Sequence, residues 1–141
     1  MNTLNFPDVN VWVALMWRRH THAEKARLWF DRTSDQQFVF CRITQLSVLR
    51  LLTTERALGA DVHTMRSAWK LWDQVTADER IVFVAEPEGL EPPFRKASQL
   101  PNRSPKVWAD AYLLGFAASA GLKLVTFDRA LAGRSADALV L

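Results

Sequence analysis

The sequence predicts an α/β protein in which a central parallel sheet is flanked by helices on both faces, an α/β/α sandwich. Short apolar runs alternate with segments of helical periodicity along the whole chain. Two of the strand-like runs end directly before an aspartate, at Asp8 and Asp128, and the most apolar helix-like segment holds a third, Asp110. Since open parallel sheets bind ligands at the carboxyl ends of their strands, we expect a site where Asp8 and Asp128 lie.

The first half of the chain is expected to contain two strands and three helices. Its strands are the short apolar runs Leu4–Pro7 and 38–41, which are rich in residues that favour buried strands. Asn10 is expected to cap a first helix, a second spans 21–31, and Thr44 is expected to cap a third.

The second half is expected to continue the alternation after a break at 59–61. Gly121 follows the most apolar helix at the position that glycine commonly takes after a helix C-terminus. The expected elements are a helix opened by Thr64, a strand at 81–84, a short helix at 94–100, the helix Val107–Ala120, a strand at 123–127 and a terminal edge strand at 138–141.

Composition places the chain among globular proteins of about one domain. It has 141 residues, 49% hydrophobic and 23% charged, which excludes a disordered chain. The net charge of +3 supports attraction to phosphate only weakly, because many proteins without a nucleic-acid role share it. The single Cys41 fits a reducing cytoplasm. We expect no signal peptide and no membrane span.

The three aspartates predict a divalent-metal site. Aspartate is rarely buried unless it is paired or bound to a metal, and three carboxylates that approach one point repel one another. Hard carboxylate oxygens hold Mg²⁺ or Mn²⁺, which supports phosphodiester hydrolysis. A structural alternative stays open: Asp8 and Asp128 are each suited to cap a helix, and Asp110 is suited to an exposed helix face.

Four segments in this order resemble the PIN-domain ribonucleases, specifically the VapC-like toxins of toxin–antitoxin pairs: FPDVNVWVAL (6–15), CRITQLSVLR (41–50), WADAYL (108–113) and TFDRAL (126–131). The resemblance covers the whole chain, 1–141, as a single PIN domain. It implies Mg²⁺- or Mn²⁺-dependent endonucleolytic cleavage of RNA, often tRNA or rRNA. It also implies a homodimer and inhibition by a small VapB-like antitoxin, without a membrane.

The resemblance also assigns roles to individual residues. Asp8, Asp110 and Asp128 match the first, third and fourth acidic positions of the family, and would hold the metal and serve catalysis. Asn10 belongs to the usual opening pattern, and Thr126 matches a hydroxyl-bearing position beside the last carboxylate. These two residues are the candidates for substrate contacts.

Two further candidates carry alternatives. Gln45 occupies the family's second acidic position, usually glutamate, and is the fourth catalytic candidate. Its amide is able to position a metal-bound water or to bind the metal through its carbonyl oxygen, but it carries no charge and cannot act as a general base. The chain is therefore expected to work with three carboxylates or to be an attenuated or inactive module that binds RNA or an antitoxin. Glu55 is an imperfect replacement for the missing acid. Arg129 is a candidate for substrate phosphate, with an ion pair to Asp128 as the structural alternative.

Overall fold

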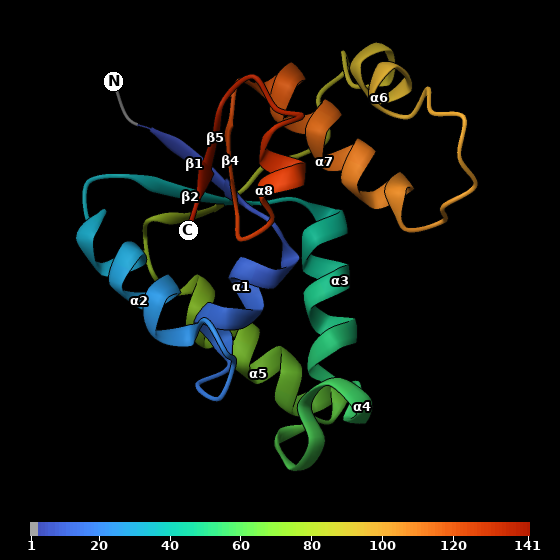
Figure 1. Ribbon diagram of the computed structural model, residues 1–141. Helices are drawn as coiled ribbons and strands as arrows, with labels where there is room; N and C mark the ends of the chain where they lie inside the picture. The colour runs from blue at the N-terminus through green and yellow to red at the C-terminus, as the bar shows by residue number, and fades with distance from the viewer. Residues whose placement is uncertain (1–2) are drawn as a thin grey trace.

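The computed structural model describes residues 3–141 and contains a five-stranded, fully parallel sheet (Figure 1). The strand order is β3-β2-β1-β4-β5. The chain therefore builds the sheet outward from β1 in both directions, and the order changes direction between β1 and β4. Such a switch point is where α/β sheets bind ligands. The strands are β1 (Leu4–Pro7), β2 (Gln37–Phe40), β3 (Ile81–Phe83), β4 (Lys123–Thr126) and β5 (Ala138–Val140).

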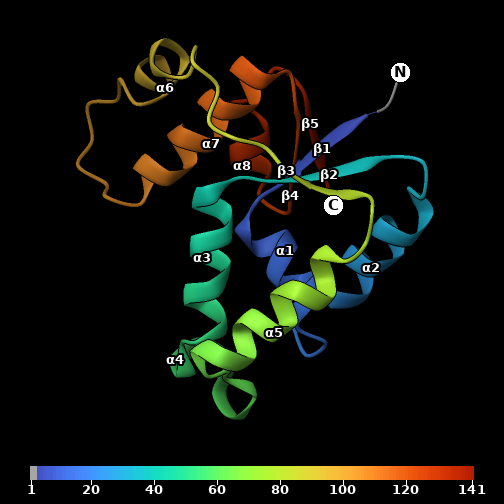
Figure 2. The same cartoon turned by 180° about the vertical axis from the view of Figure 1, so that it is seen from behind.

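Helices cover both faces of this sheet, as expected. In the two opposite views, α1, α2, α3 and α5 lie on one side of the sheet and α6 and α7 on the other (Figures 1 and 2). The helices are α1 (Val9–Met16), α2 (Ala23–Arg32), α3 (Arg42–Leu52), α4 (Glu55–Leu58), α5 (Met65–Thr76), α6 (Glu91–Ala97), α7 (Val107–Ala120) and α8 (Arg129–Ala132), with a 3₁₀ turn at Gly59–Asp61. Among the described residues no helix is long and apolar enough to cross a membrane.

Alternation along the strands divides the interior into two cores. In β2, Phe38 and Phe40 point into the core beneath α1, α3 and α5, and Val39 between them points into the core beneath α6 and α7. All three side chains are at most 1% exposed. The sheet is thus buried on both faces, which fixes the register of the strands and the positions of the residues at their ends.

Two expected helix caps are wrong. Asn10 lies exposed inside α1, and the cap is Asp8, whose carboxylate accepts from the Val11 N–H at 3.0 Å. Thr44 is the third residue of α3, where its hydroxyl accepts from the backbone N–H of Cys41. Both helices begin immediately after a strand, so they start earlier than the side-chain pattern suggested.

The other boundaries agree with the sequence to within a few residues. Val107–Ala120 is α7 in full, and Gly121 closes it in the left-handed conformation at φ 68°. Thr64 caps α5 as expected. The helix expected at 94–100 begins at Glu91, because Pro92 and Pro93 fit its first turn, where no intrahelical N–H is needed.

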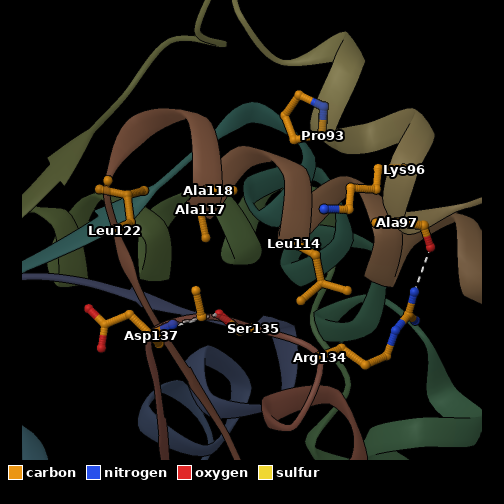
Figure 3. A pocket seen from close by; sticks show the side chains of 12 residues that line it. Pro93, Lys96, Ala97, Leu114, Ala117, Ala118, Leu122, Arg134, Ser135 and Asp137 are labelled. Carbon is orange, nitrogen blue, oxygen red and sulfur yellow. Dashed lines mark hydrogen bonds between the residues drawn. The ribbon is translucent and has the colours of Figure 1, made fainter.

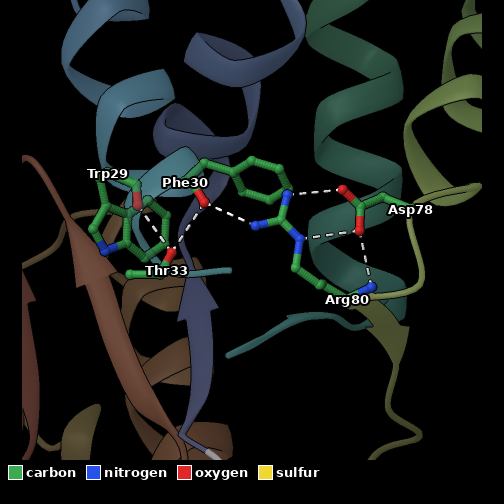
Figure 4. A network of polar contacts seen from close by, with 5 residues as sticks. All are labelled: Trp29, Phe30, Thr33, Asp78 and Arg80. Carbon is green, nitrogen blue, oxygen red and sulfur yellow. Dashed lines mark hydrogen bonds and ion pairs between the residues drawn. The ribbon is translucent and has the colours of Figure 1, made fainter. Parts of the chain in front are cut away.

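Arg80 joins α2 to the turn before β3 (Figure 4). Its guanidinium donates to the Phe30 carbonyl at 2.9 Å and to the Asp78 carboxylate at 2.9 and 3.1 Å, and it stacks over the Phe30 ring. Hydrogen bonding from Arg80 lowers the pKa of Asp78. This network holds α2 in place beside the edge strand β3.

The contact between α6 and α7 is unusually close at Gly115. A Cβ at this position would lie 2.8 Å from both the backbone N and the Cα of Phe94 in α6. Side chains essentially never approach backbone atoms this closely, so only glycine permits the two helices to meet here. The contact fixes α6 against the helix that carries Asp110.

Candidate active site

The carboxyl ends of β1 and β4 are joined through one buried hydroxyl. The Thr126 hydroxyl donates to one Asp8 oxygen at 2.5 Å, and the same hydroxyl oxygen accepts from the Asp128 backbone N–H at 3.0 Å. The other Asp8 oxygen accepts from the Val11 N–H, and the Asp8 N–H donates to the Val125 carbonyl. Asp8 is 8% exposed and Thr126 fully buried. Both oxygens of Asp8 are thereby oriented by the protein.

Asp128 is exposed at the edge of the same site. One of its oxygens accepts from the N–H groups of Ala130 and Leu131 at 2.9 and 3.1 Å, so Asp128 caps α8 as the structural alternative predicted. Capping engages one oxygen of the carboxylate. Capping and metal binding are therefore compatible at this residue.

Asp110 lies in the first turn of α7 and is half-buried. Burial raises its pKa, the negative charge of Asp128 raises it further, and the positive charge of Arg134 opposes these effects. Within residues 3–141 no hydrogen bond to the carboxylate offsets its burial. The described residues thus compensate the negative charge of Asp110 only in part.

The charges of the three carboxylates act on one another. Burial raises the pKa of Asp8 despite the hydrogen bonds from Thr126 and Val11, and the charges of Asp110 and Asp128 add to this rise. Keeping Asp8 and Asp110 ionised at neutral pH therefore costs folding free energy.

Replacing Asp110 by asparagine is expected to stabilise the metal-free protein at neutral pH. Because folding raises the pKa of Asp110, its stability cost appears as pH rises above the ordinary value near 3.8 and is fully present above the raised pKa. In EDTA at pH 7 we expect the melting temperature to rise by about 1–4 °C, corresponding to at most about 1 kcal/mol.

Melting curves of Asp110→Asn between pH 3 and 8 check this result. The gain should vanish near pH 3, where the wild-type carboxyl is itself protonated. Asp73→Asn, at an exposed position of α5, is the matched control and should melt as the wild type does. A variant that melts below the wild type in EDTA at pH 7 would show that the Asp110 charge is well compensated.

The carboxylates are not a ready-made set of ligands. Within the described part of the chain, no three acidic, histidine or cysteine side chains are close enough together to hold one ion as they stand. In charge and donor chemistry, however, the group fits Mg²⁺ or Mn²⁺: its donors are carboxylate oxygens, it carries excess negative charge, and Asp110 is free of hydrogen bonds from residues 3–141.

The remaining predicted residues lie around this group. Gln45 is 7% exposed on α3, and its side-chain carbonyl accepts from the guanidinium of Arg42, which lies three residues earlier on the same helix. Arg129 is exposed, and it makes no ion pair with Asp128 among the residues described. Asn10 is exposed on α1, and Glu55 is exposed at the start of α4.

One cavity of the described structure lies away from the carboxylates. It encloses about 740 Å³ between α6, α7 and the loop before β5, and Leu114, Lys96 and Arg134 are among its lining residues (Figure 3). None of the three aspartates lines it. A carboxylate at the surface, such as the exposed Asp128, suits a large polymeric substrate, which needs no deep enclosing pocket.

The chain is similar in sequence to a known family of proteins. The profile of the PIN domain matches residues 6–135. Ribonuclease VapC41 of Mycobacterium tuberculosis is 43% identical over 128 residues, covering 87% of this chain and 88% of its own.

Two solved structures share the fold. The VapBC2 structure of Rickettsia felis, bound to a promoter DNA fragment, superposes with a TM-score of 0.70 at 9% identity and covers 99% of this chain and 98% of its own. VapC20 of Mycobacterium tuberculosis, a sarcin–ricin loop cleaving toxin, gives a TM-score of 0.65 at 16% identity over 92% and 93% of the two chains. The chain therefore belongs to the PIN-domain family and, within it, to the VapC-type ribonuclease toxins.

Proposed function

We propose that this chain is a metal-dependent endoribonuclease that hydrolyses a phosphodiester bond in RNA, with tRNA or rRNA as the substrate class. The observation that carries the proposal is the group formed by Asp8, Asp110 and Asp128 at the switch point of the sheet, where the pKa of two of the three carboxyls is raised. Family membership supports RNA cleavage, and the charge of the group supports Mg²⁺ or Mn²⁺ as the cofactor.

The three carboxylates would hold the cation, which when bound polarises the scissile phosphate and lowers the pKa of a water molecule. Thr126 and the Val11 N–H fix both oxygens of Asp8, and the first turn of α8 fixes one oxygen of Asp128. Asp110, with its raised pKa and without a hydrogen bond from the described residues, is the group best suited to accept a proton from the attacking water.

The same proposal includes the partners and the compartment. A VapB-like antitoxin would neutralise the toxin, supported by the likeness to VapC41 and by the fold shared with the VapBC2 structure. A homodimer or a toxin–antitoxin hetero-oligomer is the proposed assembly. Cytoplasmic action fits the buried, unpaired thiol of Cys41 and the location of RNA.

Metal-dependent cleavage of total tRNA and rRNA tests the proposal. The purified chain should produce discrete fragments in Mn²⁺ or Mg²⁺, and EDTA should abolish them because the carboxylates alone cannot activate water. Fragments are resolved on denaturing gels. Undiminished cleavage in EDTA would contradict a metal-dependent mechanism, and the absence of cleavage in every metal would contradict the enzyme itself.

A module that binds without cleaving is the second candidate. Gln45 in place of an acid, together with carboxylates that are not preassembled, favours it. Gln45→Glu distinguishes the candidates in the same assay: a large gain in cleavage would identify a weakened enzyme. If neither protein cleaves in Mn²⁺ while RNA still binds, the non-cleaving module is favoured.

A further inference from the structure

The carboxyl ends of the strands form one edge of the sheet, which is acidic at β1 and β4 and carries a cation and an aromatic ring at β2 and β3. All strands are parallel, so their carboxyl ends lie along one edge in the order β3, β2, β1, β4. Asp8 and Asp128 follow β1 and β4. Phe83 ends β3, and Arg42 begins the helix that follows β2. The acidic half of the edge is therefore continued by a cation and an aromatic ring.

Arg42 and Phe83 form an exposed pair on this edge. The guanidinium carbon of Arg42 lies 4.7 Å from the centre of the Phe83 ring, and the guanidinium also donates to the Gln45 carbonyl. Phe83 is 45% exposed, which is high for a phenylalanine at the end of a strand. The ring and the cation thus lie together on a part of the surface that solvent reaches.

The charge of Arg42 is not neutralised by the protein. No acidic side chain within residues 3–141 forms an ion pair with it. Its side-chain partner is Gln45, an uncharged residue. The amide orients the guanidinium by a hydrogen bond and leaves the full positive charge available to an anion.

A cavity of about 350 Å³ opens beside this pair. Its volume is in the range of small-ligand pockets. Trp72 and Phe40 pack against each other at its base with ring centres 4.5 Å apart, and Thr76 and Gln45 supply polar groups. The cavity therefore offers a flat heterocycle an aromatic surface, hydrogen-bonding groups and a cation.

We propose that Arg42, Gln45 and Phe83 form a subsite for one nucleotide of single-stranded RNA. The Arg42 guanidinium binds a phosphate, and the Phe83 ring stacks on a base, the interaction that proteins commonly use with unpaired bases. The inference rests on the proposed function: the scissile phosphate would lie at Asp8, two strands or about 10 Å away. The pair would thus set where along the RNA the cut falls.

A nucleotide explains this surface better than an acidic peptide. A carboxylate-rich segment would use the charge of Arg42 and would have no use for an uncovered aromatic ring. Shielding of the Phe83 ring from water by Arg42 also explains the pair poorly, because Phe83 stays nearly half exposed with Arg42 stacked on it.

RNA binding in EDTA tests the subsite independently of cleavage. The affinity of fluorescently labelled, mixed-sequence single-stranded RNA 10-mers is measured by anisotropy for the full chain. Phe83→Ala should weaken binding about tenfold through loss of one stacked base. Arg42→Gln should weaken binding and make the dependence of log K on log[salt] shallower by about 0.7, the value for one phosphate contact.

Matched controls keep the effects specific. Trp69→Ala removes an aromatic ring of similar exposure, 47%, from α5. Arg66→Gln removes an exposed arginine at the far end of α5, ten residues or about 15 Å along the helix from Thr76. Both should change affinity less than about twofold. Gln45→Glu should imitate Arg42→Gln, because a carboxylate at this position would pair with the guanidinium and neutralise it.

The outcomes separate this subsite from the proposed activity. Affinities of the Phe83 and Arg42 variants equal to those of the controls would overturn the subsite, even if the enzyme cleaves RNA. Loss of binding in Arg42→Gln alone, with RNA displaced by a poly-glutamate peptide, would also overturn it and assign the surface to an acidic peptide. The expected losses in a chain that never cleaves would support the subsite and reject the nuclease.

Discussion

Replacing Asp8 by asparagine is expected to reduce metal-dependent RNA cleavage by about 100-fold or more. Several kcal/mol of transition-state stabilisation depend on a correctly held cation, and Asp8 is the one carboxylate of the group with both oxygens oriented by the protein. Initial rates of fragment formation in Mn²⁺ measure the loss.

Asparagine separates the charge of Asp8 from its role in folding. Asparagine caps helices about as well as aspartate, so the bond from the Val11 N–H is kept. Removing the charge relieves the burial that raises the pKa of Asp8, but the asparagine amide nitrogen cannot accept from the Thr126 hydroxyl, so the metal-free protein should be about as stable as the wild type at pH 7. Asp73→Asn, at an exposed position, serves as the control for charge loss. Undiminished cleavage by a folded Asp8→Asn protein would reject the metal site.

Replacing Gly115 by alanine is expected to lower the melting temperature by about 3–10 °C. In an open helix this exchange would stabilise the protein by about 1 kcal/mol, since alanine has the higher helix propensity. Here the new methyl group would lie 2.8 Å from two backbone atoms of Phe94, which cannot rotate away as a side-chain end would. Overpacking of this kind costs about 1–3 kcal/mol.

Gly89→Ala is the matched control for Gly115→Ala. A Cβ at Gly89 has no neighbour within 4 Å, and the residue does not have a positive φ, so the exchange should be neutral or slightly stabilising. Thermal unfolding by circular dichroism gives both values. If Gly115→Ala melts at or above the wild-type temperature, α6 does not pack on α7 at the described distance.

Strong local signals made much of the fold predictable. The helix Val107–Ala120 was predicted in full because its apolar stretch ends at a glycine in the required left-handed conformation. The positions of Asn10 and Thr44 were predicted wrongly because several polar residues near a helix start can each cap it. The one that does is fixed by how the chain leaves the preceding strand.

Only the candidate site residues that lie in short sequence motifs could be predicted. The order of the four motifs assigned Asp8, Asp110 and Asp128, and their metal-binding role stays a prediction. The hydrogen bond from Arg42 to the side chain of Gln45 was not predicted. The pairing of Arg42 with Phe83, 41 residues later, depends on β3 lying beside β2, a tertiary contact without a signal in either segment.

The hydrogen bond between Asp8 and Thr126 joins residues 118 positions apart, which has a consequence for synthesis of the protein. Ribosomes add about 5–20 residues per second, so Asp8 is made roughly 6–24 s before its partner. During this time β1 also lacks β4, the neighbour that brings Asp128 to it. We infer that, under the proposed function, a nascent chain lacks the cleavage site until Thr126 and Asp128 have been synthesised and β4 has paired with β1.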